Sequence, residues 1–196
     1  MNWFKKAQLE TTLPYFQELE NEGELVPDQE KLNQTLEQKF NTKIVKDIGF
    51  GDSGVAYLLT SGDVLKITTN VQEAKVADWL ISNPNPHIIE YKAIWRDGDL
   101  FYIIMEKLDS FVKDDAKLSF TFNNFEKILE QKKCYDISCA INVLKSHPYS
   151  KNHSLLPMIL TYLSHLSQIP NVKIFDFLNP QNIGIKSEKL KFFDIT

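Results

Sequence analysis

The pattern of apolar residues changes at Thr42, and this change limits the fold more than any other feature of the chain. The stretches TKIVKDIGF, GVAYLLTS and GDVLKITT alternate in polarity and are rich in β-branched and aromatic residues. Glycine-containing turns separate them. Alternation with a period of two predicts strands that bury one face, and short glycine-containing connections predict hairpins. We therefore expect an antiparallel sheet to begin near residue 43.

Helices and further strands complete an α+β fold. Residues 70–81 are expected to form a helix capped by Asn70, and IIEYKAIWRDGDLFYIIMEKL is expected to form two strands around the turn DGD. The chain then becomes mostly helical, with short extended segments near its end. It divides into a helical extension (1–42), a sheet-containing part (43–109) and a helical part (110–196).

The composition excludes several classes of protein. The chain has 196 residues, a formal net charge of −4, and Arg96 as its single arginine. Bidentate reading of bases favours arginine, so nucleic-acid binding is not expected. A membrane span needs about 20 consecutive apolar residues, and the sequence offers no such run. The N-terminal residues do not resemble a signal peptide, so we expect a cytoplasmic protein or one packaged inside a particle.

The cysteine and histidine residues predict no metal or redox site. Cys134 and Cys139 have a spacing typical of neither a zinc pair nor a redox pair, which favours free buried thiols. The histidines have no ligand spacing with the cysteines or with one another.

Three glycines in IGFGDSGVAY form the pattern G-x-G-x-x-G at Gly49, Gly51 and Gly54. The pattern lies between two strands, which argues against a dinucleotide-binding fold. Two interpretations stay open. The glycines serve a tight hairpin turn, or they let backbone N–H groups approach the phosphates of a nucleotide.

Lys66, in the strand VLKIT, is the first charged candidate for a site. Burying an unpaired ammonium is costly, so a lysine flanked by apolar residues needs a partner. Glu73 lies on the next helix and is the expected partner, in an ion pair that would aim the ammonium at phosphate oxygens. The alternative is that both are solvated surface charges.

The glycine pattern, Lys66, Glu73 and FYIIMEKLD occur in an order that resembles the protein kinase-like fold, over residues 43–196. The resemblance implies a bilobal protein, with an antiparallel five-stranded N-lobe carrying one packed helix and a reduced helical C-lobe. It also implies ATP and Mg²⁺ as cofactors.

The same resemblance implies further nucleotide contacts. The glycines and Val55 would cover the nucleotide. Met105 would guard the back of the pocket, and Glu106 and Leu108 would offer backbone groups to the base.

The stretch FLNPQN resembles the catalytic loop of the family, H-R-D-x-x-x-x-N. Asn182 would then bind Mg²⁺, together with Asp194 in place of the D-F-G aspartate. The family spacing puts the catalytic aspartate at residue 177, which is Phe177, and Asp176 stands one position earlier. Either a bulge lets Asp176 act as the base, or transfer is lost as in pseudokinases. We expect impaired or absent phosphoryl transfer, with a minimal active phosphotransferase as the alternative.

The chain ends directly after this motif, without an activation segment or the large helical platform of longer kinases. The helix expected in SLLPMILTYLSHLSQI carries apolar residues on more than one side. We therefore expect a protein partner or a homodimer to cover it, because large bare apolar patches are rare on monomers. The small size resembles kinase-like proteins of bacteria and their phages, which implies the host cytoplasm or a virion. A small-molecule kinase of the antibiotic-phosphotransferase type is a weaker interpretation.

Overall fold

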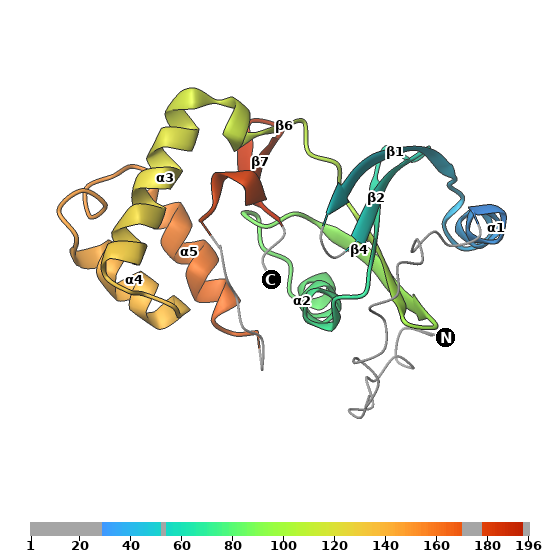
Figure 1. Ribbon diagram of the computed structural model, residues 1–196, viewed down its shortest axis with the longest axis horizontal. Helices are drawn as coiled ribbons and strands as arrows, with labels where there is room; N and C mark the ends of the chain where they lie inside the picture. Colours follow the sequence, from blue (N-terminus) through green and yellow to red (C-terminus); the bar gives the residue numbers. More distant parts are fainter. Residues whose placement is uncertain (1–28, 52–53, 170–177, 194–196) are drawn as a thin grey trace.

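A computed structural model of the chain describes residues 29–51, 54–169 and 178–193. Within these ranges the fold is α+β, with a five-stranded antiparallel sheet in the order β1-β2-β3-β5-β4 and five α-helices (Figure 1). The predicted fold class and the five antiparallel strands are therefore confirmed. The first elements are α1 (Gln29–Phe40), β1 (Ile44–Gly51), β2 (Gly54–Leu59), β3 (Val64–Thr68), α2 (Val71–Ser82), β4 (Tyr91–Asp97) and β5 (Leu100–Met105).

The remaining elements form a helical part and a second, small sheet. They are β6 (Ser110–Phe111), η2 (Val112–Asp114), α3 (Ala116–Gln131), α4 (Ile137–Ser146), α5 (Leu156–Leu166), η3 (Pro180–Asn182), β7 (Ile183–Lys186) and β8 (Lys189–Phe192). The three short strands pair in the order β6-β7-β8. None of the helices in the described ranges combines the length and apolar character that a membrane crossing requires.

The five-stranded sheet is covered on both faces. Leu32 and Leu36 of α1 are buried in one cluster with Tyr57 of β2 and Leu65 of β3. Because side chains alternate between faces along a strand, residues 64, 66 and 68 of β3 lie on the opposite face. Ile103 of β5 belongs to a second cluster with residues of α2, so α2 covers this opposite face.

Local signals in the sequence explain where α2 begins. The side chain of Asn70 accepts hydrogen bonds from the backbone N–H groups of Gln72 and Glu73, as predicted from the sequence. This cap satisfies donors that have no partner inside the helix. Glu73 therefore occupies the first turn, where the helix dipole stabilises a carboxylate.

The small sheet is joined to the segment that precedes β4. Ile88 forms a parallel bridge with Phe192 of β8, and the N–H of Ile89 donates to the carbonyl of Phe192. The N–H of Phe192 donates to the carbonyl of His87. These bonds fix the small sheet to residues 87–89, which lie between α2 and β4.

Helix α5 is packed within the chain, which removes the reason for expecting a partner on it. Five of its residues are buried in the large core cluster, where Tyr162 stacks on Phe192 of β8 at 3.7 Å between ring centroids. Helix α4 packs against α5 and contributes Ala140 and Leu144 to the same cluster. A protein partner or homodimer therefore remains a prediction, and the apolar residues of α5 no longer support it.

The expectation of free thiols was wrong, because Cys134 and Cys139 form a disulfide. The sequence interval between them is the turn that separates α3 from α4, and this turn brings their Cα atoms to 5.4 Å. The side chain of Asp136 caps α4 by accepting from the N–H of Cys139. The spacing of the two cysteines matches no motif, so the sequence pattern did not reveal the disulfide.

Candidate functional site

The predicted ion pair between Lys66 and Glu73 is present. Lys66 Nζ lies 2.5 Å from Glu73 Oε1, and the exposed fractions of the two side chains are 18% and 5%. Lys66 stands opposite Ala56 of β2 and Ile103 of β5, so strands flank it on both sides. Because the charge is compensated by the carboxylate, the ammonium can be held at this largely apolar face.

The glycines of the predicted phosphate-binding hairpin have different surroundings. A Cβ on Gly54 would overlap the carbonyl oxygen of Ile67 on the paired strand, so Gly54 permits the close approach of β2 to β3. Gly49, at an irregularity of β1, has open space where a Cβ would stand. Gly51 pairs with Gly54 at the end of the hairpin, and residues 52–53 lie outside the described ranges. The close approach of the strands explains Gly54, whereas nothing in the packing requires a glycine at position 49.

Val55 does not lie beside Lys66. It is buried in the cluster with α1 and stands opposite Ile67, on the face of the sheet away from Lys66. The alternation of side chains along β2 instead places Ala56 on the face of Lys66. Val55 therefore does not share the sheet face of Lys66, and its assignment as a nucleotide contact stays a prediction without support from this arrangement.

The predicted base-contacting residues fall at the end of β5 and in the segment 106–109, called the linker here because it connects β5 to β6. Met105 is buried on the same sheet face as Lys66 and pairs with Val64. Glu106 and Leu108 lie in the linker itself. The side chain of Leu108 is buried against Gly184 of β7, at a contact that a Cβ on the glycine would obstruct.

Asn182 closes the short helix η3 directly before β7. Its backbone carbonyl accepts from the N–H of Phe193, and its N–H donates to the carbonyl of Asn179. Among the described residues the side-chain amide of Asn182 has no hydrogen-bond partner, so its oxygen is available to a ligand. Asp176 and Asp194 lie outside the described residues.

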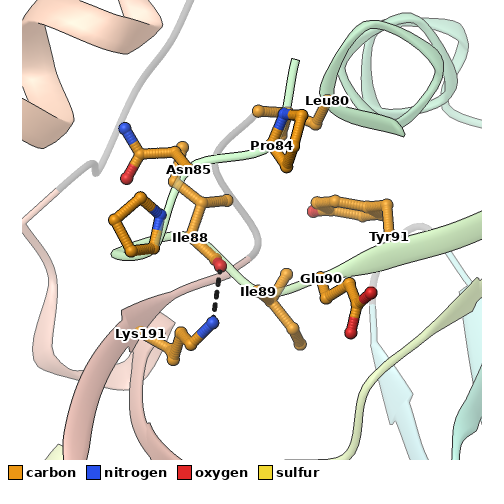
Figure 2. Close-up of a pocket in the computed structure, with 9 residues that line it drawn as sticks. Leu80, Pro84, Asn85, Ile88, Ile89, Glu90, Tyr91 and Lys191 are labelled. Carbon is orange, nitrogen blue, oxygen red and sulfur yellow. Dashed lines mark hydrogen bonds between the residues drawn. The ribbon is translucent and has the colours of Figure 1, made fainter. Parts of the chain in front are cut away.

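A cavity of about 360 Å³ lies beside the segment between α2 and β4 (Figure 2). Its lining includes Leu80, Pro84, Ile88, Tyr91 and Lys191. Lys191 was not singled out in the sequence, where it is one of two lysines in the last strand. In the structure it is largely buried, and its ammonium donates to the carbonyl of Ile88, as Figure 2 shows.

His87 stands next to this cavity wall and is affected by the same lysine. Burial lowers the pKa of His87, and the positive charges of Lys191 and Lys189 lower it further. A neutral imidazole is therefore favoured at the junction of the two sheets.

The described residues contain no group of three or more His, Cys, Asp and Glu side chains arranged to hold a metal ion. The predicted magnesium ligands are the amide of Asn182 and the carboxylate of Asp194, which lies outside the described residues. The absence of such a group therefore does not test them. A search of protein-family models and of curated proteins finds no match to the chain.

Proposed function

We propose that this chain is a bilobal, kinase-like protein that binds Mg-ATP and has impaired or absent phosphoryl transfer. The observation that carries the proposal is the buried Lys66–Glu73 pair on a sheet face that also bears Ala56 and Met105. A lysine held by a helix glutamate beside a glycine hairpin is suited to bind phosphate oxygens. The five strands with α1 and α2 would form one lobe, and the reduced second lobe would begin at residue 110.

The described residues would have distinct roles in binding. Glu73 would orient the ammonium of Lys66 toward the phosphates, and the hairpin around Gly49 and Gly51 would cover them with backbone N–H groups. The amide oxygen of Asn182 is a hard ligand suited to Mg²⁺, and the ion would offset the negative charge of the nucleotide when bound. Asp194 would supply a second oxygen ligand.

The residues around the predicted base support impaired transfer. The position expected for the catalytic aspartate is Phe177, and Asp176 is displaced by one residue. Transfer relies mostly on positioning and electrostatic stabilisation, so binding can persist where the base is lost. If Asp176 reaches the substrate hydroxyl, the chain is instead a minimal active phosphotransferase, and this alternative rests on that residue alone.

Binding of Mg-ATP, measured by calorimetric titration, tests the proposal. We expect Lys66→Ala to weaken binding by at least about tenfold, because the loss of a charge-assisted contact to phosphate costs about 1.5–3 kcal/mol. Lys92→Ala is the matched control, since Lys92 pairs with Asp63 through an ion pair of 2.7 Å and has no predicted contact with nucleotide. The proposal is wrong if the wild-type protein does not bind Mg-ATP or if both variants bind it equally well.

Phosphoryl transfer is measured separately, as release of phosphate from ATP or labelling of the protein itself. We expect rates near those of a protein-free control. Activity that disappears in Asp176→Asn, while Mg-ATP binding is kept, would establish the active alternative.

The proposal includes a cytoplasmic location, in a host cell or a virion, and a protein partner or homodimer. Sedimentation of the purified chain, alone and with Mg-ATP, reports the oligomeric state directly.

A further inference from the structure

The disulfide between Cys134 and Cys139 joins two sulfur atoms with different surroundings. Cys134 follows α3 and is only 8% exposed, within the large core cluster. Cys139 is the third residue of α4 and is partly buried. The nearby residues Tyr135, Asp136 and Ser138 are all exposed. A small molecule in solution can therefore reach Cys139 more readily than Cys134.

The start of α4 favours a negative charge on the sulfur of Cys139. The first N–H groups of a helix have no acceptor within the helix, and the helix dipole adds a positive potential there. The N–H of Cys139 donates to the carboxylate of Asp136 at 2.7 Å. The N–H groups of Ile137 and Ser138 have no acceptor among the described residues. Helical side chains lean toward the N-terminus of their helix, so the sulfur of Cys139 lies at this first turn, where a thiolate is stabilised.

The surroundings of Cys134 have the opposite effect. Burial among apolar side chains disfavours a thiolate, so Cys134 is expected to stay protonated when the disulfide is reduced. Its N–H donates to the carbonyl of Leu129 at 3.0 Å, which fixes it to the end of α3. Its Cα lies 5.4 Å from that of Cys139, within the range that a disulfide requires. Cys134 is therefore placed to complete a disulfide rather than to start the reaction that forms it.

We propose that Cys139 is a redox-reactive thiol that hydroperoxides oxidise in the reduced protein, and that Cys134 converts the product to the disulfide. An accessible thiolate beside a second cysteine is the arrangement found at redox-sensing sites. The inference is independent of the proposed function, because it involves no residue of the candidate nucleotide site.

The reaction has two steps. The thiolate of Cys139 first attacks one oxygen of the peroxide, the O–O bond breaks, and the other oxygen leaves as hydroxide. This step forms a sulfenic acid on Cys139. The sulfur of Cys134 then attacks the sulfenic sulfur, and the hydroxyl group leaves with the thiol proton as water. The two cysteines together lose two electrons, and the peroxide gains them.

The carboxylate of Asp136 is the nearby group that opposes the first step. It accepts the N–H of Cys139, and its negative charge disfavours a second negative charge on the sulfur of the same residue. Asn caps a helix about as well as Asp does. The substitution Asp136→Asn therefore keeps the start of α4 and removes the charge, so it is expected to make Cys139 more reactive.

Two matched variants, Cys134→Ala and Cys139→Ala, test which sulfur reacts. Each lacks the disulfide and keeps one thiol. Both are treated at pH 7 with hydrogen peroxide and dimedone, which adds to sulfenic acids, and the adduct is followed by mass spectrometry. We expect the adduct on Cys139 to form about tenfold faster than the adduct on Cys134, because a helix N-terminus raises the thiolate fraction by about that factor. Adding Asp136→Asn to Cys134→Ala should raise the rate further, and unfolding in urea should abolish the difference between the two cysteines.

The reduced wild-type protein provides a test without a substitution in the core. We expect hydrogen peroxide to restore its disulfide with little dimedone adduct, because Cys134 consumes the sulfenic acid. Limiting iodoacetamide should label Cys139 first, and fragmentation of the peptide that ends at Lys145 identifies the labelled cysteine. This labelling decides the assignment if either variant fails to fold.

Three results would overturn the inference. Equal rates at the two cysteines would remove the assignment of Cys139 as the reactive thiol. A Cys139 that reacts no faster in the folded Cys134→Ala variant than in urea would show that the start of α4 does not activate it. A reduced wild-type protein that does not regain the disulfide with hydrogen peroxide would show that the disulfide is a static crosslink. Titration with Mg-ATP is unaffected by any of these results, so the proposed function is judged separately.

Discussion

At the scale of single residues, the hydroxyl of Tyr162 is the clearest unfavourable feature of the core. The ring stacks on Phe192, and the hydroxyl oxygen is buried without a hydrogen-bond partner among the described residues. A buried hydroxyl without a partner keeps its desolvation cost. Burial raises the pKa of Tyr162 well above its ordinary value, and Tyr91 raises it further.

Tyr162→Phe is expected to increase the free energy of unfolding by about 1 kcal/mol at pH 7, since the ring is kept and only the unsatisfied hydroxyl is removed. The raised pKa adds a pH dependence. Above pH 10 the unfolded chain loses the Tyr162 proton before the folded protein does, so wild-type stability falls as pH rises, by up to about 1.4 kcal/mol per pH unit. Urea unfolding at pH 7 and pH 10.5 measures both effects. A contrary result would be a Tyr162→Phe variant with a lower free energy of unfolding at pH 7, whose stability falls above pH 10 as steeply as that of the wild-type protein. It would show that the hydroxyl is satisfied.

The glycines allow a matched comparison. Gly54→Ala is expected to destabilise the protein by about 1–3 kcal/mol, because its methyl group meets the backbone of Ile67, which cannot move away without breaking the strand pair. Gly49→Ala meets open space and is expected to change stability by less than about 0.5 kcal/mol. Thermal unfolding of the two variants provides the measurement. Equal losses would mean that the hairpin, rather than the contact with Ile67, sets the requirement.

Single residues also show which parts of the site could be predicted. The Asn70 cap and the Lys66–Glu73 pair could be predicted because their partners are close in the sequence. A cap depends on its neighbours, and Glu73 follows the buried Lys66 on the next helix. The sequence motif did not reveal that Val55 lies on the face opposite Lys66, because a shift of one residue reverses the face of a strand. The ion pair between Glu106 and Lys191 could not be predicted, because Lys191 is 85 positions away and only the folded chain brings the two together.

At the scale of elements, the turn between α3 and α4 shows how the boundaries of two helices bring two cysteines together. The sequence indicated one or two helices here, and the structure has two, with Asp136 beginning the second. The disulfide joins the turn that follows α3 to the first turn of α4. It therefore constrains a junction that is otherwise held by the packing of α3 on α4.

Cys139→Ser is expected to lower the free energy of unfolding by about 2 kcal/mol, the loop entropy that a short disulfide removes from the unfolded chain. Adding a reductant to the wild-type protein is expected to produce the same loss, and the variant should not respond to it. Urea titrations with and without reductant, together with a thiol assay of the unfolded protein, make the measurement. Two free thiols in the untreated protein would contradict the disulfide.

At the scale of the whole molecule, the large core continues across the boundary at residue 110 that the sequence indicated. One cluster includes Val76 of α2, Ile103 of β5, Leu144 of α4 and Phe192 of β8. The change in sequence pattern near residue 110 separates β1–β5 from a mostly helical part that also contains β6, β7 and β8. It carries no information on whether the two parts share a core, because that depends on contacts between residues far apart in the chain.

A shared core predicts that the sheet and the helical part unfold together. Leu144→Ala removes a fully buried side chain from α4 and is expected to cost about 2–5 kcal/mol. If unfolding is cooperative, the slowest-exchanging amides of β3 and β5 lose protection by that same free energy, although they lie in another part of the fold. Hydrogen exchange followed residue by residue makes the measurement. Leu36→Ala is the positive control, because Leu36 is equally buried and packs directly against Leu65 of β3, so its truncation is expected to lower the protection of these strands. Full protection of β3 and β5 in Leu144→Ala would mean that the two parts fold independently, and the continuity of the core would then contribute little to stability.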